Sequence, residues 1–278
     1  MELDLVEELG EFPALAYRDT FAPHVPEPIA GAALPPGWEG LYFPFRVPLA
    51  DLREDGSPAR DGILPEFGLP IRRYAGEDTT FHRPLRYGDP VRQRTRAGTV
   101  TEKTGRSGRL VFADLVRTFH CAGELAVESV WHDVFLEANP GSPRQPEPAP
   151  DRPADWTETL IMDRRMLFRF SAITFNTHRI HYDLDWARTA ENLPDLLVHG
   201  PLLRLLLLDS VVRQHPDRAV HGYRFRALAP TLAETMITIS GRSDDDGAGV
   251  FALDQDHGIL AEGRIDWADP VLEPTEGR

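Results

Sequence analysis

The sequence predicts an α+β protein built from two halves, each an antiparallel sheet curled around a central helix. Residues 138–156 are rich in proline and divide the chain into parts of similar length. On both sides of them, alternating apolar and polar residues are separated by turn signals, which is typical of antiparallel strands. In the second part, residues 200–215 form a strongly apolar stretch of helical length. We therefore assign residues 1–137 to an N-terminal half, 138–156 to a linker and 157–278 to a C-terminal half.

The strands of each half are expected where apolar and polar residues alternate. In the N-terminal half this pattern covers residues 79–136, with turn signals at Gly105–Gly108 and at Gly123. The C-terminal half repeats it with strands expected at Tyr223–Leu228, Thr235–Ser240, Val250–Asp254 and Leu260–Trp267. Between the halves, proline recurs among charged and small residues, a composition that favours an extended, semi-rigid connector.

The expected helix, Gly200–His215, is apolar on almost every side and is interrupted only by Arg204, Asp209 and Arg213. Such a helix must be covered on most of its surface. An antiparallel sheet wrapped around one such helix is the hot-dog arrangement, so the chain is expected to be a double hot-dog. Residues 34–67 of the first half are rich in proline and glycine. We therefore expect the N-terminal half to be a degenerate copy.

Composition narrows the class of function. The 278 residues carry a formal net charge of −14, and so acidic a surface repels phosphate backbones and anionic lipids. We expect neither a nucleic-acid nor a membrane partner.

The single cysteine, Cys121, excludes an intrachain disulfide and a multi-thiolate metal site. The N-terminus lacks a signal-peptide pattern, and the longest apolar run, Leu202–Leu208, is too short to span a bilayer. We expect a cytoplasmic protein.

The segment Phe170–Ala187 (FSAITFNTHRIHYDLDWA) is the richest in chemically capable residues. Its proton-transferring and hydrogen-bonding side chains fall within eight positions: Asn176, His178, His181 and Asp183. About ten residues later comes Leu196–Leu203 (LLVHGPLL), in which Gly200 and Pro201 begin the apolar helix. Proline is favourable in the first turn, and the free N–H groups there can bind negative charge that develops on an oxygen.

Together with VHGPLL at Val198–Leu203, this segment resembles the MaoC-like, (R)-specific enoyl-CoA hydratases. It is most similar to their two-domain group, which includes 3-methylfumaryl-CoA and mesaconyl-C4-CoA hydratases and mitochondrial hydroxyacyl-thioester dehydratases. Two further motifs of this group stand in the N-terminal half, FHRPLRYGD at Phe81–Asp89 and TEKTGRSGRLVF at Thr101–Phe112. The four motifs occur in order, so the resemblance extends from about residue 34 to residue 267.

The resemblance implies roles for individual residues. It places His181 at the catalytic histidine and Gly200 at the glycine whose N–H binds the thioester carbonyl. Asp183 corresponds to a residue that we expect to orient the loop. Asn176 stands where the single-domain enzymes have a catalytic aspartate, a change that is common in the two-domain group.

This change alters the expected chemistry. Addition of water to a 2-enoyl thioester needs a base for the water, a proton for the α-carbon and stabilisation of the enolate oxygen. The amide of Asn176 does not titrate in the useful range, although its side-chain oxygen can hold the water. The acid–base role then belongs to His181, whose ordinary pKa of about 6.5 suits proton exchange near neutrality. We predict a hydratase/dehydratase that interconverts 2-enoyl and 3-hydroxyacyl thioesters.

Neighbouring residues have supporting or competing interpretations. We interpret His178 and Arg179 as structural or pantetheine-proximal residues, and His199 as a packing or hydrogen-bonding residue beneath the helix start. An Asx turn at Asn176 competes with its role in binding water. A metal cluster is another interpretation, but no second shell supports it, and we predict no metal at His178, His181 and Asp183.

No cofactor is expected, because the dinucleotide, P-loop and nucleophile-elbow motifs are absent. The expected partner is an acyl-CoA or acyl-carrier-protein thioester. Basic residues that could meet its phosphates are Arg83, Arg86, Lys103, Arg106 and Arg179. A double hot-dog already contains the two-copy unit that single-domain relatives form by dimerising, so both a monomer and a homodimer are open.

Two alternative functions use the same features. An amine or another nucleophile could add to the enoyl thioester, or the thioester could be hydrolysed, because Asn176 weakens the requirement for water. A non-catalytic acyl-thioester-binding protein is a further alternative. The combination of His181 with Gly200 argues against it, since a pure binder needs no base beside its carbonyl site.

Overall fold

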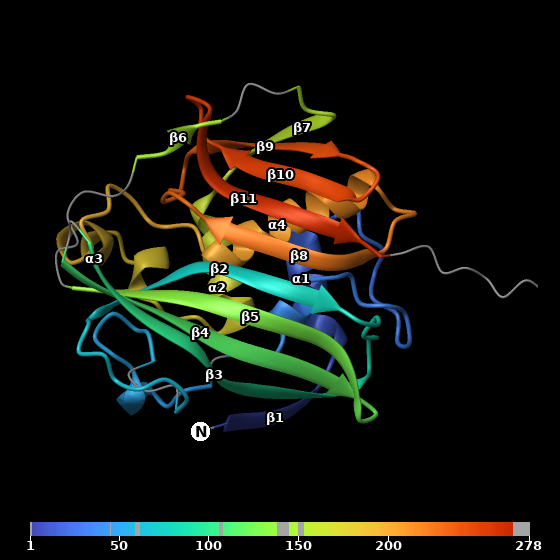
Figure 1. Ribbon diagram of the computed structural model, residues 1–278, viewed down its shortest axis with the longest axis horizontal. Helices are drawn as coiled ribbons and strands as arrows, with labels where there is room; N and C mark the ends of the chain where they lie inside the picture. The colour runs from blue at the N-terminus through green and yellow to red at the C-terminus, as the bar shows by residue number, and fades with distance from the viewer. Residues whose placement is uncertain are drawn as a thin grey trace, which may run out of the picture.

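The structure, a computed structural model, describes residues 2–44, 46–58, 62–105, 108–137, 145–149 and 153–268. Within these ranges the strands form one eleven-stranded antiparallel sheet in the order β1-β3-β4-β5-β2-β8-β11-β10-β9-β7, with β6 paired to β11 (Figure 1). The predicted α+β class is confirmed. No helix of the described residues is long and apolar enough to cross a membrane.

The strands are grouped by half along this sheet. The N-terminal half contributes β1 (Glu2–Glu8), β2 (Ile71–Phe81), β3 (Pro90–Gly105), β4 (Gly108–Cys121) and β5 (Glu124–Leu136). The C-terminal half contributes β7 (Trp156–Ile161), β8 (Val220–Ala227), β9 (Met236–Ser243), β10 (Gly247–Leu253) and β11 (Gly258–Trp267). The short strand β6 (Glu147–Pro148) belongs to the proline-rich segment, of which residues 138–144 and 150–152 lie outside the described residues.

The two groups join where β2 pairs with β8. This ladder runs from Gly76 opposite Arg226 to Thr80 opposite Gly222. An ion pair between Arg226 Nη1 and Asp78 Oδ1, 2.6 Å apart, crosses the same seam. Both halves therefore share one sheet.

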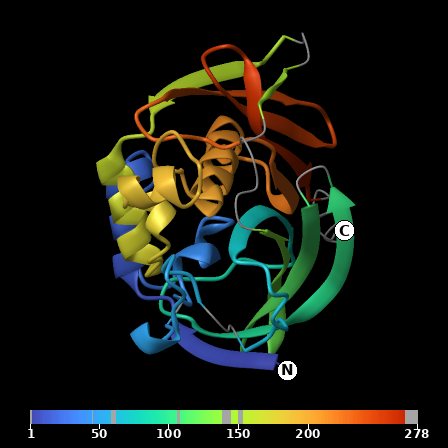
Figure 2. The ribbon, with the colours of Figure 1, turned by 90° about the vertical axis from the view of Figure 1, so that its left-hand side faces the viewer.

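The apolar helix predicted for the C-terminal half is α4 (Gly200–Gln214). It packs against β8, β9, β10 and β11, and it also contacts β2 (Figure 2). The strand residues that it covers are large and apolar, including the fully buried Tyr223 and Phe225. The hot-dog arrangement is thus confirmed for this half.

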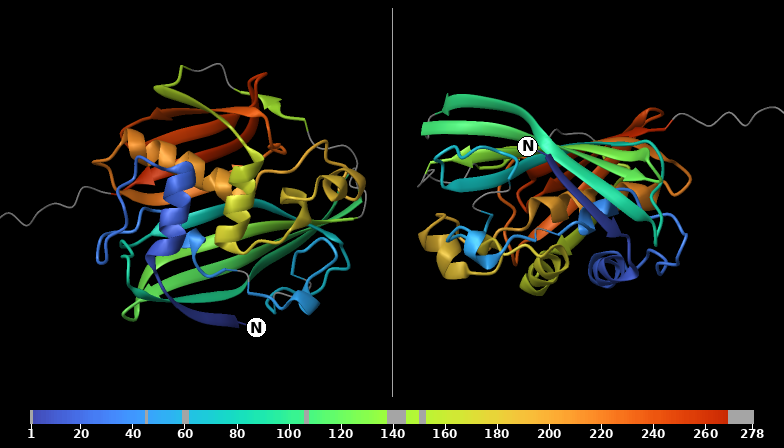
Figure 3. Two further views of the ribbon diagram at one scale, coloured as in Figure 1. Left: turned by 180° about the vertical axis from the view of Figure 1, so that it is seen from behind. Right: turned by 90° about the horizontal axis from the view of Figure 1, so that it is seen from below.

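Among its described residues, the N-terminal half has no comparable helix beneath its strands. Irregular chain with the short 3₁₀ helices η1 (Trp38–Leu41) and η2 (Leu49–Asp51) occupies the corresponding space. The helix α1 (Glu11–Phe21) instead lies beside α2 (Arg164–Thr174), away from the curl of this sheet (Figure 3). The degenerate N-terminal copy predicted from the sequence is therefore what the structure contains.

Two strands extend beyond the predicted pattern. The sheet includes β1, and β2 begins at Ile71 rather than at residue 79. β1 is short and acidic, and it is an edge strand that pairs with the arginine-rich β3. The first part of β2 contains a register shift between Tyr74 and Gly76, which breaks the alternation that marks a strand in sequence.

Candidate active site

The loop between α2 and α3 (Leu184–Thr189) holds the histidines of the central motif, with the 3₁₀ helix η3 (Arg179–His181) inside it. The side-chain oxygen of Asn176 accepts a hydrogen bond of 3.0 Å from the N–H of His178. This is an Asx turn, and it fixes the direction of the loop. It leaves the amide N–H₂ of Asn176 and one lone pair of its oxygen for other contacts.

His181 is held in one tautomer. Its Nδ1 lies 2.7 Å from the carbonyl oxygen of Leu197, which can only accept a hydrogen bond, so Nδ1 carries the proton. In the neutral ring Nε2 is then a free base. Burial, and secondarily the neighbouring His178, lower the pKa of His181 to about 3. The ring is therefore neutral in the resting protein.

His199 supports this ring from behind. The His181 and His199 rings are stacked, with centroids 3.6 Å apart. His199 is fully buried, and its Nε2 lies 2.8 Å from the hydroxyl oxygen of Ser171 on α2. Its backbone is the N-cap of α4. His199 thus links α2, the loop that carries His181 and the start of the central helix.

Gly200 is the first residue of α4, where backbone N–H groups have no intrahelical acceptor. A Cβ atom at this position would lie 2.3 Å from Cδ1 of Tyr74 on β2. The ring of Tyr74 therefore packs directly on the helix start, and only glycine permits this approach. The contact joins the N-terminal half to the proposed oxyanion site.

Asp183 and Arg179 lie on the outer side of the loop. One oxygen of Asp183 caps α3 by accepting a bond from the N–H of Trp186, and the other lies 2.7 Å from Arg179 Nη2. The guanidinium of Arg179 also lies over the Trp186 ring, 4.0 Å from its centroid. Both charged groups are thus engaged in fixing the loop.

One group of three side chains in the described ranges has donor atoms close enough for a metal ion, and these atoms, from Asp55, His178 and Glu191, lie within 4.8 Å of one another. Arg73 already forms an ion pair with Glu191. Burial and then the charge of Arg73 lower the pKa of His178 to about 3, and the same positive field opposes a dication. The metal cluster considered in the sequence consisted of His178, His181 and Asp183. The observed group shares only His178 with it, and Asp183 forms an ion pair with Arg179 instead.

A loop of the N-terminal half holds the loop between α2 and α3 in place. A Cβ on Gly56, whose φ is +81°, would lie 2.0 Å from the carbonyl oxygen of Thr177. Thr177 Oγ1 donates to the Gly56 carbonyl at 2.8 Å, and the N–H of Arg179 donates to the Asp55 carbonyl at 2.7 Å. The histidine-bearing loop of one half is therefore held by backbone groups of the other.

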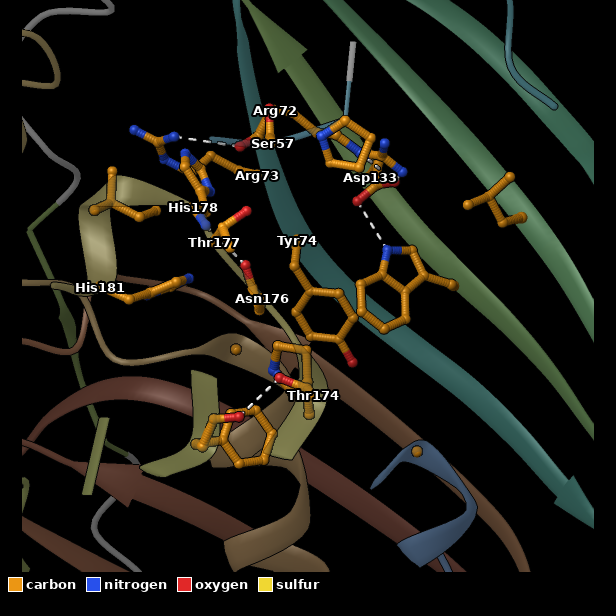
Figure 4. Close-up of a pocket in the computed structure, with 18 of the residues that line it drawn as sticks. Ser57, Arg72, Arg73, Tyr74, Asp133, Thr174, Asn176, Thr177, His178 and His181 are labelled. Atoms are coloured by element: carbon orange, nitrogen blue, oxygen red, sulfur yellow. Dashed lines mark hydrogen bonds and ion pairs between the residues drawn. The ribbon is translucent and has the colours of Figure 1, made fainter. Parts of the chain in front are cut away.

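A cavity of about 980 Å³ is lined by Gly56, Tyr74, Asn176, Thr177, His178, His181 and Gly200. The predicted site residues Arg179, Asp183 and His199 are not part of this lining. His181, His178, Asn176 and Tyr74 are arranged around a common space in Figure 4. The cavity continues beneath the N-terminal strands, in the space that lacks a central helix. Side chains from both halves line it.

Most of the basic residues predicted to meet a carrier lie away from this cavity. Arg83 pairs with Glu124, and Arg86 donates to the Gly31 carbonyl at 2.8 Å, both beyond the far end of β2. Lys103 lies over the ring of Phe112, 5.1 Å from its centroid. Arg106 lies outside the described residues. None of the four described residues, Arg179 included, belongs to the cavity lining.

The contribution of β2 to the cavity was not predicted from the sequence. Arg72, Arg73 and Tyr74 line the cavity beside the histidines. Arg72 pairs with the buried Asp133 at 2.5 Å, and Arg73 with Glu191. The available signal was that two arginines, Arg72 and Arg73, are adjacent at the start of a strand. Neighbouring strand residues point to opposite faces of a sheet, so the two guanidiniums could not both have the same exposure to solvent.

Comparison with known proteins supports the resemblance noted in the sequence. The sequence profile of hydroxyacyl-thioester dehydratase type 2 matches residues 37–233. Mesaconyl-C(4)-CoA hydratase of Chloroflexus aurantiacus is 39% identical over 237 residues, which are 84% of this chain and 83% of that protein. The mitochondrial hydroxyacyl-thioester dehydratase type 2 of Schizosaccharomyces pombe is 34% identical over 76 residues, 27% of this chain and 25% of that protein.

Solved structures agree on the fold. HtdX of Mycobacterium tuberculosis has a TM-score of 0.70 at 19% identity, covering 95% of this chain and 99% of that one. A MaoC-like dehydratase from Phytophthora capsici has a TM-score of 0.69 at 15% identity, with coverage of 97% and 96%. A further M. tuberculosis protein with a double hot-dog fold has a TM-score of 0.62 at 14% identity, with coverage of 96% and 95%.

Proposed function

The chain belongs to the hydroxyacyl-thioester dehydratase type 2 family, and from this premise we propose that it interconverts 2-enoyl and 3-hydroxyacyl thioesters with His181 as its acid–base residue. The family and the relative of 39% identity make it a hydro-lyase of the hydratase/dehydratase class. The finer assignment concerns which residues act on the substrate and in what order.

One observation carries this assignment. His181 has its Nδ1 proton fixed on the Leu197 carbonyl, and it lines the same cavity as Gly200 at the start of α4. A base and an oxyanion donor thus face one space. This pairing is what addition to an α,β-unsaturated thioester requires.

In the hydration direction, the thioester carbonyl oxygen accepts a hydrogen bond from the Gly200 N–H. His181 Nε2 removes a proton from water while the water oxygen bonds to the β-carbon. The electron pair of the double bond moves to the carbonyl oxygen, which gives an enolate and an imidazolium. The imidazolium then returns its proton to the α-carbon, so that the net change is the addition of one water molecule. Dehydration is the reverse.

The low pKa of His181 fits this cycle. A buried neutral imidazole is unprotonated near neutral pH and is ready to accept a proton. The enolate formed in the same step places a negative charge in the cavity. That charge raises the proton affinity of His181 while the intermediate lasts, because opposite charges in a buried site attract strongly.

Asn176 is proposed to position the water. Its oxygen already accepts the His178 N–H, so the amide N–H₂ and the remaining lone pair make the contact. His178 remains a loop-fixing residue beside the substrate channel. Asp183 and Arg179 keep the loop in register from its outer side.

The acyl carrier is proposed to be coenzyme A or an acyl-carrier protein. The carrier contacts predicted at Arg83, Arg86 and Lys103 receive no support from their positions. Arg72 and Arg73, which line the cavity and form ion pairs with Asp133 and Glu191, are proposed in their place. Mesaconyl-C(4)-CoA, which the relative's name specifies, is the first substrate to assay.

The proposal is tested by following loss of enoyl absorbance and release of free thiol together, with crotonyl-CoA and mesaconyl-C(4)-CoA. Loss of absorbance without thiol is expected. Thiol release would instead indicate hydrolysis, and no change with any thioester would indicate a binding protein. Adding an amine to the assay tests whether another nucleophile replaces water.

His181→Ala is expected to lower kcat by at least about 10²-fold, the usual scale for loss of a general acid–base residue. His221→Ala is the matched control, because His221 is an exposed residue on β8. If His181→Ala kept more than a tenth of the wild-type rate while folded, the acid–base assignment would be wrong.

A further inference from the structure

The imidazole of His178 takes no part in the mechanism above. His178 fixes the loop through its backbone N–H, which donates to the side-chain oxygen of Asn176, and this contact does not involve the ring. The ring lines the same cavity as that of His181. The two ring centroids lie 5.6 Å apart, and the rings are nearly perpendicular, with an angle of 81° between their planes. A second buried imidazole thus lies beside the proposed base.

The Nε2 atom of His178 faces two carboxyl groups. It lies 3.7 Å from Asp55 Oδ2 and 4.0 Å from Glu191 Oε1, and it is buried without a hydrogen-bond partner. Carboxylate oxygens only accept hydrogen bonds, so both would repel a lone pair on this nitrogen. The proton of the neutral ring is therefore on Nε2.

Both carboxyl groups are themselves held in place. Asp55 Oδ1 accepts hydrogen bonds from the N–H and the hydroxyl of Ser57, at 2.7 and 2.6 Å. Glu191 forms an ion pair with Arg73. Asp55 and Glu191 are only 6% and 5% exposed. Two fixed, buried acceptors therefore set the orientation of the His178 ring.

The other ring nitrogen of His178, Nδ1, carries the lone pair. Burial and then the charge of Arg73 lower the pKa of His178 to about 3, so the ring is neutral at physiological pH. No group in the described part of the chain forms a hydrogen bond to Nδ1, and of the two ring nitrogens only Nε2 is both buried and unpaired. Nδ1 is therefore the nitrogen that is open to the cavity.

The two histidines are thus opposite tautomers. His181 has its proton on Nδ1, against the Leu197 carbonyl, and its lone pair on Nε2. His178 has its proton on Nε2 and its lone pair on Nδ1. Two acceptors from one loop therefore serve one cavity, and the N–H₂ group of Asn176 adds a donor. Water, with two O–H bonds and an oxygen that accepts, is the complement of this set.

We propose that His178 is a second catalytic residue, whose Nδ1 accepts a hydrogen bond from the attacking water and so directs the other water proton to His181. In hydration, His181 Nε2 takes that proton while the water oxygen bonds to the β-carbon. The proton held by His178 stays on the oxygen, which becomes the 3-hydroxyl group. In dehydration the 3-hydroxyl donates to His178 while the imidazolium of His181 protonates its oxygen and water leaves. No proton is transferred to His178 in either direction. The inference rests on the hydratase/dehydratase proposed above and adds a residue to its site.

Two substitutions of His178 differ in whether they keep this acceptor. His178→Leu removes both nitrogens, whereas the side-chain oxygen of His178→Asn is attached to Cγ, as Nδ1 is in histidine. We expect kcat for hydration of crotonyl-CoA or mesaconyl-C(4)-CoA to fall at least about tenfold in His178→Leu, the scale of one lost hydrogen bond, and at most about threefold in His178→Asn. His221→Leu is the matched control, because His221 is an exposed residue on β8.

Hydrogen exchange at the α-carbon separates a role at the water from a role in the loop. Exchange of the α-hydrogens of butyryl-CoA in D₂O needs the base and the oxyanion donor but no attacking water. His178→Leu should therefore exchange them as fast as wild-type protein, whereas His181→Ala should not exchange them. Mass spectrometry of the recovered thioester measures the rate.

The proton positions can be observed without any assay of activity. Long-range ¹H–¹⁵N NMR spectra near neutral pH should show the proton on Nε2 in His178 and on Nδ1 in His181. The signals of His178 are assigned by their loss in His178→Asn. His178→Gln is a further variant, because its amide can donate to Asp55 and Glu191 as Nε2 does but has no acceptor at the position of Nδ1. It should slow hydration and spare α-exchange even if His178→Leu does not fold.

The outcomes separate the two proposals. If wild-type protein hydrates no thioester, the proposed function fails, whatever the tautomer of His178. If it does hydrate one and folded His178→Leu retains more than half of that rate, the function stands and the role of His178 is refuted. Equal losses of hydration and α-exchange in both His178→Leu and His178→Gln would also refute it, because they would show a disturbed loop. A proton on Nδ1 of His178 would contradict the acceptor on which the inference depends.

Discussion

Gly200→Ala tests the contact between the two halves at the oxyanion site. The added Cβ would lie 2.3 Å from Tyr74 Cδ1, whereas ordinary contacts begin near 3.4 Å. One of the two groups must therefore move by 3.4 − 2.3, or about 1.1 Å. The Tyr74 ring has little freedom to move, because its centroid lies 4.4 Å from that of the Trp131 ring and 6.0 Å from that of the Phe225 ring. Overpacking of this kind costs about 1–3 kcal/mol.

The same displacement should impair catalysis. If the start of α4 yields, the Gly200 N–H moves by about 1 Å from the thioester oxygen, a misplacement that typically lowers kcat/KM about 10²-fold. This corresponds to about 2.7 kcal/mol. Urea unfolding measures the first effect, and initial rates of enoyl-CoA hydration measure the second. Gly249→Ala is the control, because a Cβ there meets no atom within 4 Å.

A double-mutant cycle with Tyr74→Ala identifies the cause. With the ring removed, Gly200→Ala should lose most of its stability cost, giving a coupling energy of about 1–2 kcal/mol. An unchanged cost in that background would show that the clash with Tyr74 is not responsible. A Gly200→Ala variant with wild-type stability and rate would refute the reasoning as a whole.

Three further predictions concern charge and backbone geometry. Because the pKa of His181 is about 3, kcat/KM should stay nearly constant from pH 8 to pH 5, whereas a fall centred near pH 6.5 would mean that the ring titrates normally. Burial raises the pKa of Asp209 from 3.8 to about 6, so its contribution to stability is full below about pH 4 and is lost as pH rises through 6. Relative to Asp209→Asn, wild-type protein should therefore gain about 1 kcal/mol in urea unfolding between pH 7 and pH 5, and an equal pH response of both proteins would contradict this. Gly56→Ala should cost about 3 kcal/mol, because its Cβ would lie 2.0 Å from the Thr177 carbonyl oxygen. Gly68→Ala is the control, because Gly68 has a similar φ of +69° and a Cβ there would meet no atom within 4 Å. If both variants lost the same free energy of unfolding, backbone strain alone would be the cause and the contact with Thr177 would not.

The features that the sequence predicted correctly are local in origin. The helix expected at Gly200–His215 is observed at Gly200–Gln214, because its apolar residues and Gly-Pro start are consecutive in the chain. The Asx turn at Asn176 likewise depends on a neighbour two residues away. Short-range signals of this kind are readable without knowledge of the fold.

The features that were missed depend on tertiary contact. Nothing near Gly56 in the sequence indicates that it lies against Thr177, more than a hundred residues later. Arg83 and Arg86 carried the right charge for a carrier site but lie beyond the opposite end of β2 from Tyr74. Residue type can be read from the sequence. Which arginines reach the cavity depends on the position of β2 beside α4, which is a tertiary contact.

The polar residues of α4 explain how one helix can serve both halves. Arg204 donates to Thr79 on β2 at 2.7 Å, and Asp209 accepts hydrogen bonds from Tyr17 on α1 and Trp38 on η1. A helix that covered only its own sheet would have no use for buried charges, since each must be paired to be tolerated. Here Arg204 and Asp209 each bind an element of the N-terminal half, whereas Arg213 forms an ion pair with Glu158 on β7. Because α4 anchors that half, its sheet does not need a helix of its own, and the space beneath it can become the cavity in which we propose that the thioester binds.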